Sequence, residues 1–349
     1  MKRNKACRFI MLLLILVTLY LGFLGVNYFP VWQRQLTRGP AAAITNTGSF
    51  DQDETSYKDI NYTARLEQVR NVCQTLPEYG KRVHVKATKL QDIFVNDKYK
   101  FLYCAIPKVS STTWKKLLLK LSGFDVDFNV SATEIYDFDK QYRRGLESMS
   151  LKHYSAAGIK YRLKNYFKFV VVRDPLERLL SAYRNKFHNE NNTYFPHTYG
   201  RQIIGLYRKN PSSQDMHTGA DVSFAEFVQF VVDPLTGDEQ KSNAHWKTYY
   251  DLCLPCVVKY NLIAKYETLA ADARHILKLL NVADQIKFPK RSLNYQYTQT
   301  SELVEEAYRN VSMWQLKALW DTFRLDFEMF GYEFQASKSK KLAHESITF

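Results

Sequence analysis

Two segments of this chain combine a basic residue with the pattern of a strand that runs into a helix. In the first, the apolar run Phe101–Ile106 leads through a proline to Lys108, and hydroxyl residues then open a helical pattern. In the second, the apolar run Phe169–Val172 leads to Arg173, and Ser181 follows within the next helical pattern. The start of a helix presents backbone N–H groups and a positive dipole end, and both favour an anion. Together the two segments predict a site for a ligand that carries two separated phosphate groups.

The chemistry of the first loop must come from its lysine and hydroxyls, because it lacks the glycine-rich pattern of nucleotide triphosphatases. Lys108 would neutralise charge on a bridging oxygen, while hydroxyls and helix N–H groups bind the peripheral oxygens. The alternative is an ordinary helix N-terminus, where serine and threonine are common caps. Arg173 favours the anion site, because open α/β sheets bind ligands at the carboxyl ends of their strands. Asp174 has the type of a helix N-cap, and Glu177 and Arg178 have the types of an ion pair.

The elements that position these segments predict an α/β domain. Between about residues 81 and 334, strand-like and helix-like patterns alternate without a linker long enough to divide them. Such alternation predicts a single domain in which helices flank a mainly parallel sheet, and we place its limits at 76–334. We expect helices at Pro175–Phe187 and Phe224–Val232, and a further strand at Leu262–Tyr266.

The last helix of this domain is expected at Met313–Phe330, followed by a tail at 335–349. Its apolar side chains recur at helical spacing, which predicts a stripe that packs in the core. The stripe consists of Trp314, Leu316, Leu319, Trp320, Phe323, Phe327 and Phe330.

The N-terminal residues predict a membrane anchor. Residues 9–29 form an uncharged apolar stretch of about the length that spans a bilayer as a helix. Four basic residues precede it, so the positive-inside rule places residues 1–8 in the cytosol and the rest of the chain in a lumen. A cleaved signal peptide is the alternative, but the stretch is long for one and no small-residue cleavage site follows it. Residues 30–75, which are largely polar, are expected to form a luminal stem.

Sequons and cysteines agree with a luminal domain. Four Asn-x-Ser/Thr sequons lie on the luminal side, at Asn61, Asn129, Asn191 and Asn310. Four cysteines also lie there, at Cys73, Cys104, Cys253 and Cys256. An even number in an oxidising compartment favours disulfide bonds, although the three possible pairings stay open. The close pair at 253 and 256 is also half of a zinc pattern, but no second pair lies at metal-ligand spacing.

The charge of the chain favours anionic partners. The formal net charge is +14, from 49 basic and 35 acidic residues. In a lumen the expected polyanions are glycosaminoglycans and nucleotide cofactors rather than nucleic acids. A solvated basic surface without a specific partner is the alternative that charge alone leaves open.

The two phosphate-binding segments resemble the cofactor motifs of Golgi carbohydrate sulfotransferases. The resemblance rests on Pro107–Trp114 and Val172–Tyr183 and covers most of the luminal part, from about residue 73 to residue 332. It continues through Arg184–Phe187, His245-Trp246, Cys253–Cys256 and Lys265–Leu269. The group it points to includes chondroitin and dermatan 4-O-sulfotransferases, N-acetylgalactosamine 4-O-sulfotransferases and the glucuronyl 3-O-sulfotransferase of the natural killer epitope.

This resemblance implies a fold, a location and a cofactor. The fold is the P-loop-like sulfotransferase fold, in a single-pass type II protein of the Golgi membrane whose catalytic domain is luminal. The sulfate donor is 3′-phosphoadenylyl sulfate. No metal is required if Lys108 and the N–H groups of its loop supply the charge that stabilises the leaving phosphate. The implied partner is a glycosaminoglycan or glycoprotein glycan that accepts the sulfate.

The resemblance also implies the roles of individual residues. Lys108 is the central cation of the loop that grips the 5′-phosphosulfate and is an expected catalytic residue, while Arg173 and Ser181 hold the 3′-phosphate. Lys290 and Arg291 lie where they could close over the cofactor. The whole implied loop consists of Pro107, Lys108, Val109, Ser110, Ser111, Thr112 and Thr113.

Transfer of a sulfuryl group to a sugar hydroxyl also needs a group that accepts the hydroxyl proton. As in phosphoryl transfer, the enzyme mainly positions the reactants and stabilises charge on the leaving phosphate. A base works best with a pKa near the working pH, which favours histidine or a glutamate with a raised pKa. The histidines to weigh are His153, His188, His197, His217 and His245. We favour His245, because the His-Trp pair lies in the resembling stretch; a buried structural histidine is the alternative.

The expected acceptor is position 4 of N-acetylgalactosamine in chondroitin- or dermatan-type chains, because Glu177–Phe187 looks most like that branch. Glucuronyl 3-O-sulfation is the alternative within the family, and recognition would lie in loops such as Asn189–Gln214. A different class is a metal-dependent Golgi glycosyltransferase that uses an Asp-x-Asp pair. Two such pairs occur, at Asp125 and Asp127 and at Asp137 and Asp139.

A third class is a glycosaminoglycan-binding protein without catalysis, which would use only the basic surface. Both this class and the glycosyltransferase leave the two phosphate-binding segments unexplained. Neither gives Lys108 or Arg173 a role, so the sulfotransferase is the better hypothesis.

Overall fold

Four short strands form one sheet, in the order β1-β2-β3-β4. The strands are β1 (Ile93–Asn96), β2 (Phe101–Cys104), β3 (Phe167–Val172) and β4 (Leu262–Lys265). β2, β3 and β4 run parallel, and β1 pairs antiparallel with β2. The prediction of an α/β fold is therefore confirmed, with a mixed sheet that has one antiparallel edge strand. Since β2, β3 and β4 are parallel, their carboxyl ends meet at one edge, and the two segments with Lys108 and Arg173 both begin there.

The structure is a computed structural model that describes residues 60–77, 86–128, 140–188, 192–237, 243–289 and 298–334. All of these residues belong to one unit of the chain, Phe50–Phe349. Among them, no helix has the length and apolar character needed to cross a membrane. Several expected features lie outside the described residues: the anchor at 9–29, most of the stem, the tail at 335–349, Asn129, Asn191, Asp137, Asp139, Lys290 and Arg291.

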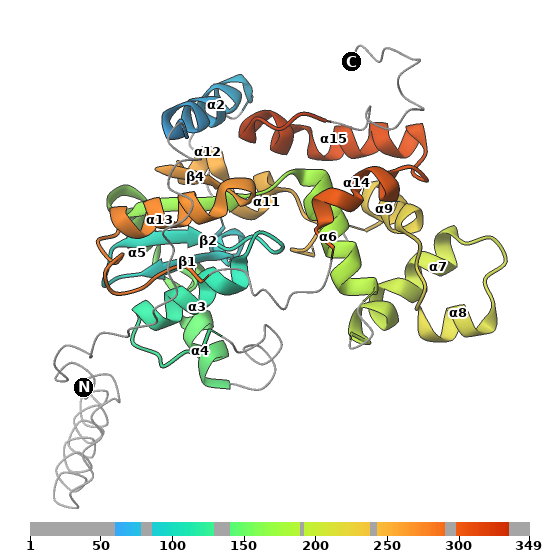
Figure 1. Cartoon of the computed structure of the whole chain (residues 1–349), viewed down its shortest axis with the longest axis horizontal. Coiled ribbons are helices and arrows are strands. Elements are labelled where there is room, and N and C mark those ends of the chain that lie inside the picture. The colour runs from blue at the N-terminus through green and yellow to red at the C-terminus, as the bar shows by residue number, and fades with distance from the viewer. Residues whose placement is uncertain are drawn as a thin grey trace, which may run out of the picture. The chain divides into compact units, whose positions relative to one another are not determined.

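Helices make up most of the remaining described chain (Figure 1). The longer helices are α2 (Tyr62–Thr75), α3 (Ser111–Leu121), α4 (Lys140–Ser148), α5 (Ala156–Asn165), α6 (Pro175–Phe187), α9 (Phe224–Val232), α13 (Leu269–Leu279), α14 (Thr300–Tyr308) and α15 (Met313–Phe330). The shorter ones are η2 (Ala87–Leu90), η4 (Leu151–His153), η5 (Pro196–Gly200), α7 (Arg201–Tyr207), α8 (Ser213–Thr218), α11 (Tyr249–Cys253), α12 (Pro255–Val258) and η6 (Tyr266–Thr268). The predicted bounds of α6, α9 and α15 are confirmed.

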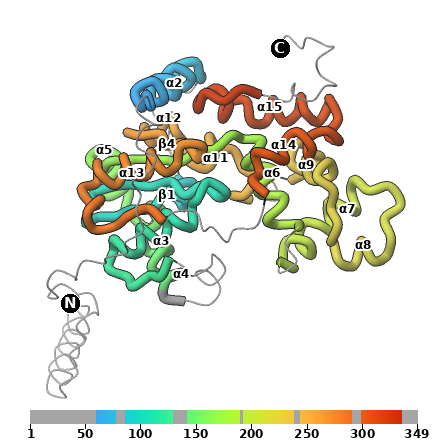
Figure 2. Tube along the Cα trace, viewed as in Figure 1, coloured from blue at the N-terminus to red at the C-terminus, as the bar shows by residue number. Residues whose placement is uncertain are grey.

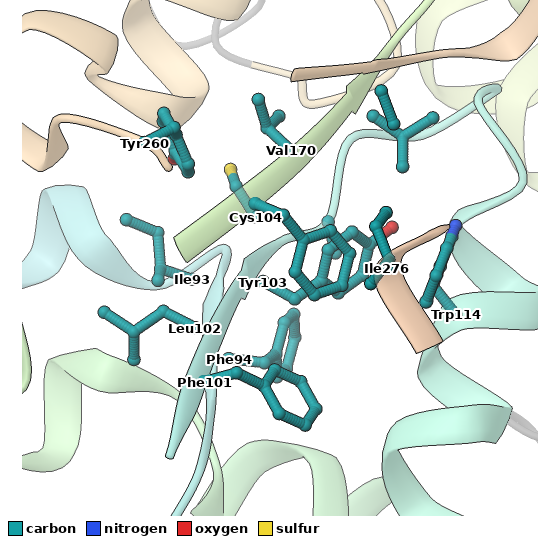
Figure 3. Close-up of a cluster of buried hydrophobic side chains, with 14 of the residues drawn as sticks. Ile93, Phe94, Phe101, Leu102, Tyr103, Cys104, Trp114, Val170, Tyr260 and Ile276 are labelled. Carbon is teal, nitrogen blue, oxygen red and sulfur yellow. The ribbon is translucent and has the colours of Figure 1, made fainter. Parts of the chain in front are cut away.

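Two hydrophobic cores hold these elements together. The first surrounds the sheet, and Figure 3 shows Tyr103 and Trp114 among its buried side chains. The second lies among α6, α7, α9, α14 and α15, helices that Figure 1 and Figure 2 show beside the sheet. α15 contributes Leu316, Leu319, Phe323 and Phe327 to the second core, as its stripe predicted. Trp314 is an exception, with 56% of its surface exposed, because it lies two residues before Leu316 and so faces away from the stripe.

Two disulfide bonds settle the pairing that the sequence left open. Cys73 of α2 pairs with Cys256 of α12, and Cys104 at the end of β2 pairs with Cys253 at the end of α11. The second bond fixes the chain around residue 253 to the strand that leads into the Lys108 loop. The first fixes α2, which belongs to the described end of the expected stem. Arg65 of α2 also forms an ion pair with Asp272 of α13 at 2.7 Å.

Candidate functional site

The first phosphate-binding segment forms a sharp turn between β2 and α3. Its backbone enters the left-handed region at Lys108 and Ser110, with φ of 74° and 67°. Ser110 is the N-cap residue, but its side chain does not bond the helix backbone; its hydroxyl lies 3.2 Å from Thr113 Oγ1 instead. The N-terminus of α3 therefore has no side-chain cap from Ser110. Its first N–H groups and the hydroxyls of Ser111 and Thr112 suit an anion.

Trp114 holds this turn on the sheet. It lies in the first turn of α3 and is 3% exposed. Its ring centroid lies 4.9 Å from that of Phe169 in β3 and 5.8 Å from that of Tyr103 in β2. Aromatic pairs at these separations add to the burial of their surfaces. The loop that carries Lys108 is thus anchored to the two neighbouring parallel strands.

The second segment places Arg173 against the first. The Arg173 side chain is buried and lies 4.3 Å over the ring of Tyr266, the first residue of η6, which directly follows β4. Its Nη1 donates to the carbonyl oxygen of Lys108 at 3.4 Å, and its Nε donates to Glu177 Oε2 at 3.1 Å. The structure therefore brings the two predicted halves into contact. Glu177 pairs with Arg173, so the ion pair expected between Glu177 and Arg178 is wrong.

Ser181 lies on α6 one helical turn after Glu177, which places both side chains on the same face of the helix. It is partly buried, and within the described part of the chain its hydroxyl makes no hydrogen bond. Asp174 caps α6 as predicted, because its side chain accepts a hydrogen bond from the Glu177 N–H at 3.0 Å. The start of α6 is therefore already capped by a carboxylate, and anion binding here would depend on Arg173 and Ser181.

Arg178 joins three segments of the site through its guanidinium. It is 2% exposed and donates to the carbonyl oxygens of Pro107 at 3.2 Å, Ala244 at 2.7 Å and Lys247 at 2.7 Å. Pro107 directly precedes Lys108, and Ala244 directly precedes His245. Because one guanidinium spans only a few ångströms, these bonds place the Lys108 loop and the His245 loop side by side. The sequence contains no signal for this role, since all three partners are backbone carbonyls.

Tyr249 and Asp326 fix the segment that follows the His245 loop. The Tyr249 hydroxyl donates to the carbonyl oxygen of Arg173 at 2.7 Å, and the Arg178 guanidinium lies 4.8 Å from the centre of its ring. Asp326 of α15 accepts the backbone N–H groups of Tyr249 at 2.7 Å and Tyr250 at 3.0 Å. Burial raises the pKa of Asp326 to about 7. With the disulfide at Cys253, these contacts hold the segment after His245 on the edge of the sheet.

Among the described candidate histidines, His245 borders the loop of Lys108 and the helix that carries Arg178 and Lys186. Its Nδ1 lies 2.8 Å from Asn243 Oδ1, and its ring packs nearly perpendicular to that of Phe195 at a centroid distance of 5.4 Å. Burial lowers the pKa of His245 well below its usual value, and nearby Lys186 and Lys108 lower it further. The imidazole is therefore neutral at pH 7, the form that can accept a proton.

The other candidate histidines are exposed and have different neighbours. His153 lies 3.0 Å from Glu147, and His188 lies 2.7 Å from the hydroxyl of Tyr183. The remaining two, His197 and His217, lie on η5 and α8.

Positive charge concentrates around Lys108. Burial lowers its pKa to about 7, and the neighbouring cations Lys186, Arg173 and Arg184 contribute in that order. Neighbouring cations lower one another's pKa by repulsion, and an anion that binds among them stabilises their charged forms. The lysine, the left-handed turn and the N-terminus of α3 are donors that fit a phosphate or sulfate group. In the described part of the chain, no cluster of three or more His, Cys, Asp or Glu side chains is arranged to hold a metal ion.

The chain belongs to the sulfotransferase family, whose family model matches residues 91–333. This protein is therefore a sulfotransferase, and membership implies 3′-phosphoadenylyl sulfate as the donor. It is 33% identical to carbohydrate sulfotransferase 11 of Mus musculus over 349 residues, which cover 95% of each chain. It is 36% identical to carbohydrate sulfotransferase 14 of Danio rerio over 284 residues, covering 80% of this chain and 74% of that one. No solved structure gives a significant match.

A third relative is carbohydrate sulfotransferase 10 of Mus musculus, 36% identical over 297 residues that cover 82% of this chain and 80% of the relative. The matched residues include the Lys108 loop, Arg173 and His245. The family, and with it the class of enzyme, agrees with the prediction from the two phosphate-binding segments.

Proposed function

We propose that this sulfotransferase transfers a sulfuryl group from 3′-phosphoadenylyl sulfate to position 4 of N-acetylgalactosamine in chondroitin- or dermatan-type chains. The observation that carries the proposed site is the guanidinium of Arg178, which holds the Lys108 loop and the His245 loop together. A cation for the leaving group and a neutral base for the acceptor thus lie at one edge of the sheet. The choice of acceptor rests on the likeness of Glu177–Phe187 to that branch of the family.

Each residue of the site then has a separate task. When bound, the donor supplies an activated sulfuryl group. Lys108 and the N–H groups at the start of α3 bind oxygens of the departing phosphate and stabilise its charge, with the hydroxyls from Ser110 to Thr113 around them. Arg173 and Ser181 hold the 3′-phosphate and so identify the donor. Arg173 also pairs with Glu177, so we expect its guanidinium to share its donors between that carboxylate and the phosphate.

His245 accepts the proton of the acceptor hydroxyl. Its neutral imidazole retains one unprotonated nitrogen, and the segment from Tyr249 to Cys253 fixes the loop that carries it. General bases of this kind contribute about 10²- to 10⁴-fold to rates. The other described histidines lack the contacts that place His245 beside the Lys108 loop.

The proposed location is the Golgi lumen, with the chain anchored by residues 9–29 as a type II membrane protein. The two disulfide bonds agree with an oxidising compartment. Two of the four sequons, Asn61 and Asn310, are described and exposed, as acceptors of a glycan must be. The Asn61 side chain accepts the Ala64 N–H at 2.9 Å through its oxygen, which leaves its nitrogen available for a sugar.

The acceptor is tested with the full chain purified in detergent. The protein is incubated with radiolabelled donor and with desulfated chondroitin, desulfated dermatan or a glucuronyl-lactosamine oligosaccharide, and the products are digested to disaccharides. We expect label at position 4 of N-acetylgalactosamine. Transfer to the glucuronyl sugar alone would contradict the proposed acceptor and leave the donor site unaffected. Absence of transfer to any of these glycans would also reject it.

A further inference from the structure

Asn243 contacts His245 through two hydrogen bonds to one oxygen. Its Oδ1 accepts the backbone N–H of His245 at 3.0 Å and lies 2.8 Å from the imidazole Nδ1. A backbone N–H can only donate, so the amide atom at this position is the oxygen and not the nitrogen. The other end of the amide agrees, because Nδ2 donates to the hydroxyl of Tyr199 at 3.0 Å. The backbone N–H of His245 thus determines the orientation of the Asn243 amide, and the contact with Tyr199 is compatible with it.

This orientation determines which imidazole nitrogen carries the proton. An amide oxygen has no hydrogen to donate, so the short contact with Nδ1 requires a hydrogen on Nδ1. A neutral imidazole has only one N–H, which leaves the lone pair on Nε2. The ring of His245 is then ready to accept a proton at the nitrogen opposite Asn243.

We propose that Asn243 is a positioning residue that holds His245 in the tautomer whose Nε2 accepts the proton of the acceptor hydroxyl. The inference rests on the proposed role of His245 as the base. It adds a second residue, Asn243, which determines which imidazole nitrogen of His245 accepts the proton. The interaction is neutral, so it orients the ring without adding a negative charge that would raise the pKa of the histidine.

Aromatic packing holds the partner of Asn243 in place. Tyr199 lies in η5, a single turn of π-helix, and its ring meets Trp246 edge-on at 5.1 Å and stacks on Phe195 at 5.5 Å. Phe195 in turn packs nearly perpendicular to the His245 ring. Single π-helical turns occur often at functional sites. The π-helical turn therefore supports both the amide of Asn243 and the imidazole that the amide orients.

The charged groups around His245 make its protonation sensitive to residue 243. The largest charge effects on it come from four cations: Lys186 and Arg178 of α6, Lys108 of the loop before α3, and Lys115 of α3. An aspartate at position 243 would keep an acceptor oxygen beside Nδ1 and add a negative charge. The two effects of Asn243, tautomer and charge, can therefore be separated.

A purely structural role for Asn243 is the competing explanation. Its bond to the His245 N–H is a local side-chain turn of a common kind, and its own carbonyl accepts the N–H groups of Trp246 and Lys247. Replacement by alanine removes the side-chain bond to the His245 N–H and keeps the two bonds that the backbone carbonyl of residue 243 accepts. A structural role predicts lower stability with an unchanged tautomer and pH profile, whereas a positioning role changes both.

The test compares Asn243→Ala, Asn243→Asp and His245→Ala in the full chain, with Asn165→Ala as a matched control at an exposed amide on α5. Sulfate transfer is measured between pH 5.5 and 8.5, and the imidazole tautomer is read from ¹⁵N–¹H NMR of protein labelled at histidine. We expect Asn243→Ala to lower kcat about 10- to 100-fold, part of what a general base contributes. KM for the donor should stay within about twofold, and the Nδ1–H signal of His245 should be lost.

Asn243→Asp should keep that signal and most of the activity at pH 8. Its added charge raises the pKa of His245, and because the neutral form is the active one, the acid limb of the kcat profile should shift to higher pH. Should Asn243→Ala not fold, Tyr199→Phe removes the hydrogen bond that Asn243 Nδ2 donates to the hydroxyl. The amide is then held less firmly, and kcat should fall in the same direction.

The outcomes separate this inference from the proposed base. If His245→Ala retains wild-type kcat, the base assignment fails and the role of Asn243 fails with it. If His245→Ala is inactive while Asn243→Ala keeps the wild-type kcat and the Nδ1–H signal, the inference about Asn243 alone is wrong. An acid limb that is unchanged in Asn243→Asp would also overturn it.

Discussion

The affinity of the ligand-free enzyme for the donor nucleotide should weaken as the pH rises above 7. Burial and the cations Lys186, Arg173 and Arg184 lower the pKa of Lys108 to about 7. An anion binds beside the protonated form of Lys108, so the lysine must be protonated either before binding or as the anion binds. Above pH 7 this requires uptake of a proton, so the binding constant falls with pH until the pKa of Lys108 in the complex is reached.

The size of the effect follows from the charged fraction of Lys108. With a pKa of about 7, roughly half of the lysine is charged at pH 7 and roughly 3% at pH 8.5. The dissociation constant should therefore rise about 15-fold over this interval, which corresponds to about 1.6 kcal/mol. The probe is 3′-phosphoadenosine 5′-phosphate, whose phosphates are already largely ionised above pH 7.

The assay is calorimetric titration of this nucleotide at pH 7.0, 7.5, 8.0 and 8.5. Lys108→Arg is the decisive variant, because a guanidinium stays charged over the whole interval, and its dissociation constant should change less than about threefold. Lys164→Ala, at an exposed site on α5, should keep the wild-type slope. A wild-type affinity that does not vary with pH, or an equal slope in Lys108→Arg, would refute the reasoning.

Three further predictions concern the contacts that build the site. Arg178→Lys loses at least two of the hydrogen bonds that the guanidinium donates to carbonyl oxygens. The unfolding free energy should fall by about 3 kcal/mol, and Tm by about 6–12 °C. Arg144→Lys, at an exposed site on α4, should change neither quantity. Removing Cys104–Cys253 should reduce transfer activity more than removing Cys73–Cys256, although the loops closed are similar in length, and equal losses would contradict this. Arg173→Lys keeps the charge but loses the planar pairing with Glu177, so KM for the donor should rise about tenfold in steady-state assays.

The sequence predicted that the segments of Lys108 and Arg173 meet at one edge of the sheet, because each segment is marked by a local pattern. Apolar runs that end in Lys108 and Arg173 locate the carboxyl ends of two strands, and parallel pairing then brings those ends together. The start of α6 follows from its cap, Asp174, and α15 follows from the helical spacing of its apolar side chains. These signals lie within a few residues of the features they predict.

What the sequence did not predict depends on contacts between distant residues. Arg178 bonds three carbonyl oxygens, and a carbonyl is present at every position, so nothing in the residue types marks its partners. The disulfide pairing depends on how α11 and α12 lie against β2 and α2. Asn243 was missed for a different reason, because its effect is exerted through the side chain of His245 and not through a motif of its own.

The antiparallel edge strand β1 was also not predicted. It consists of Ile93–Asn96 and is separated from β2 by four residues, three of them charged. Its apolar run is only three residues long, which is too short to identify a strand from the sequence. Trp314 was wrongly placed in the core, since helical spacing identifies a stripe but does not fix its limits near a helix end.

The most direct test of the central claim is sulfate transfer by Lys108→Ala and Arg173→Ala at saturating acceptor. Each variant is compared with the wild type and with Lys164→Ala, using radiolabelled donor and desulfated chondroitin. We expect Lys108→Ala to lose at least about 100-fold in kcat, as expected for a group that stabilises charge on the leaving phosphate, and Arg173→Ala to lose mainly donor affinity. Sulfate transfer that survives both substitutions at the wild-type rate would contradict the assignment of the two segments as the donor site.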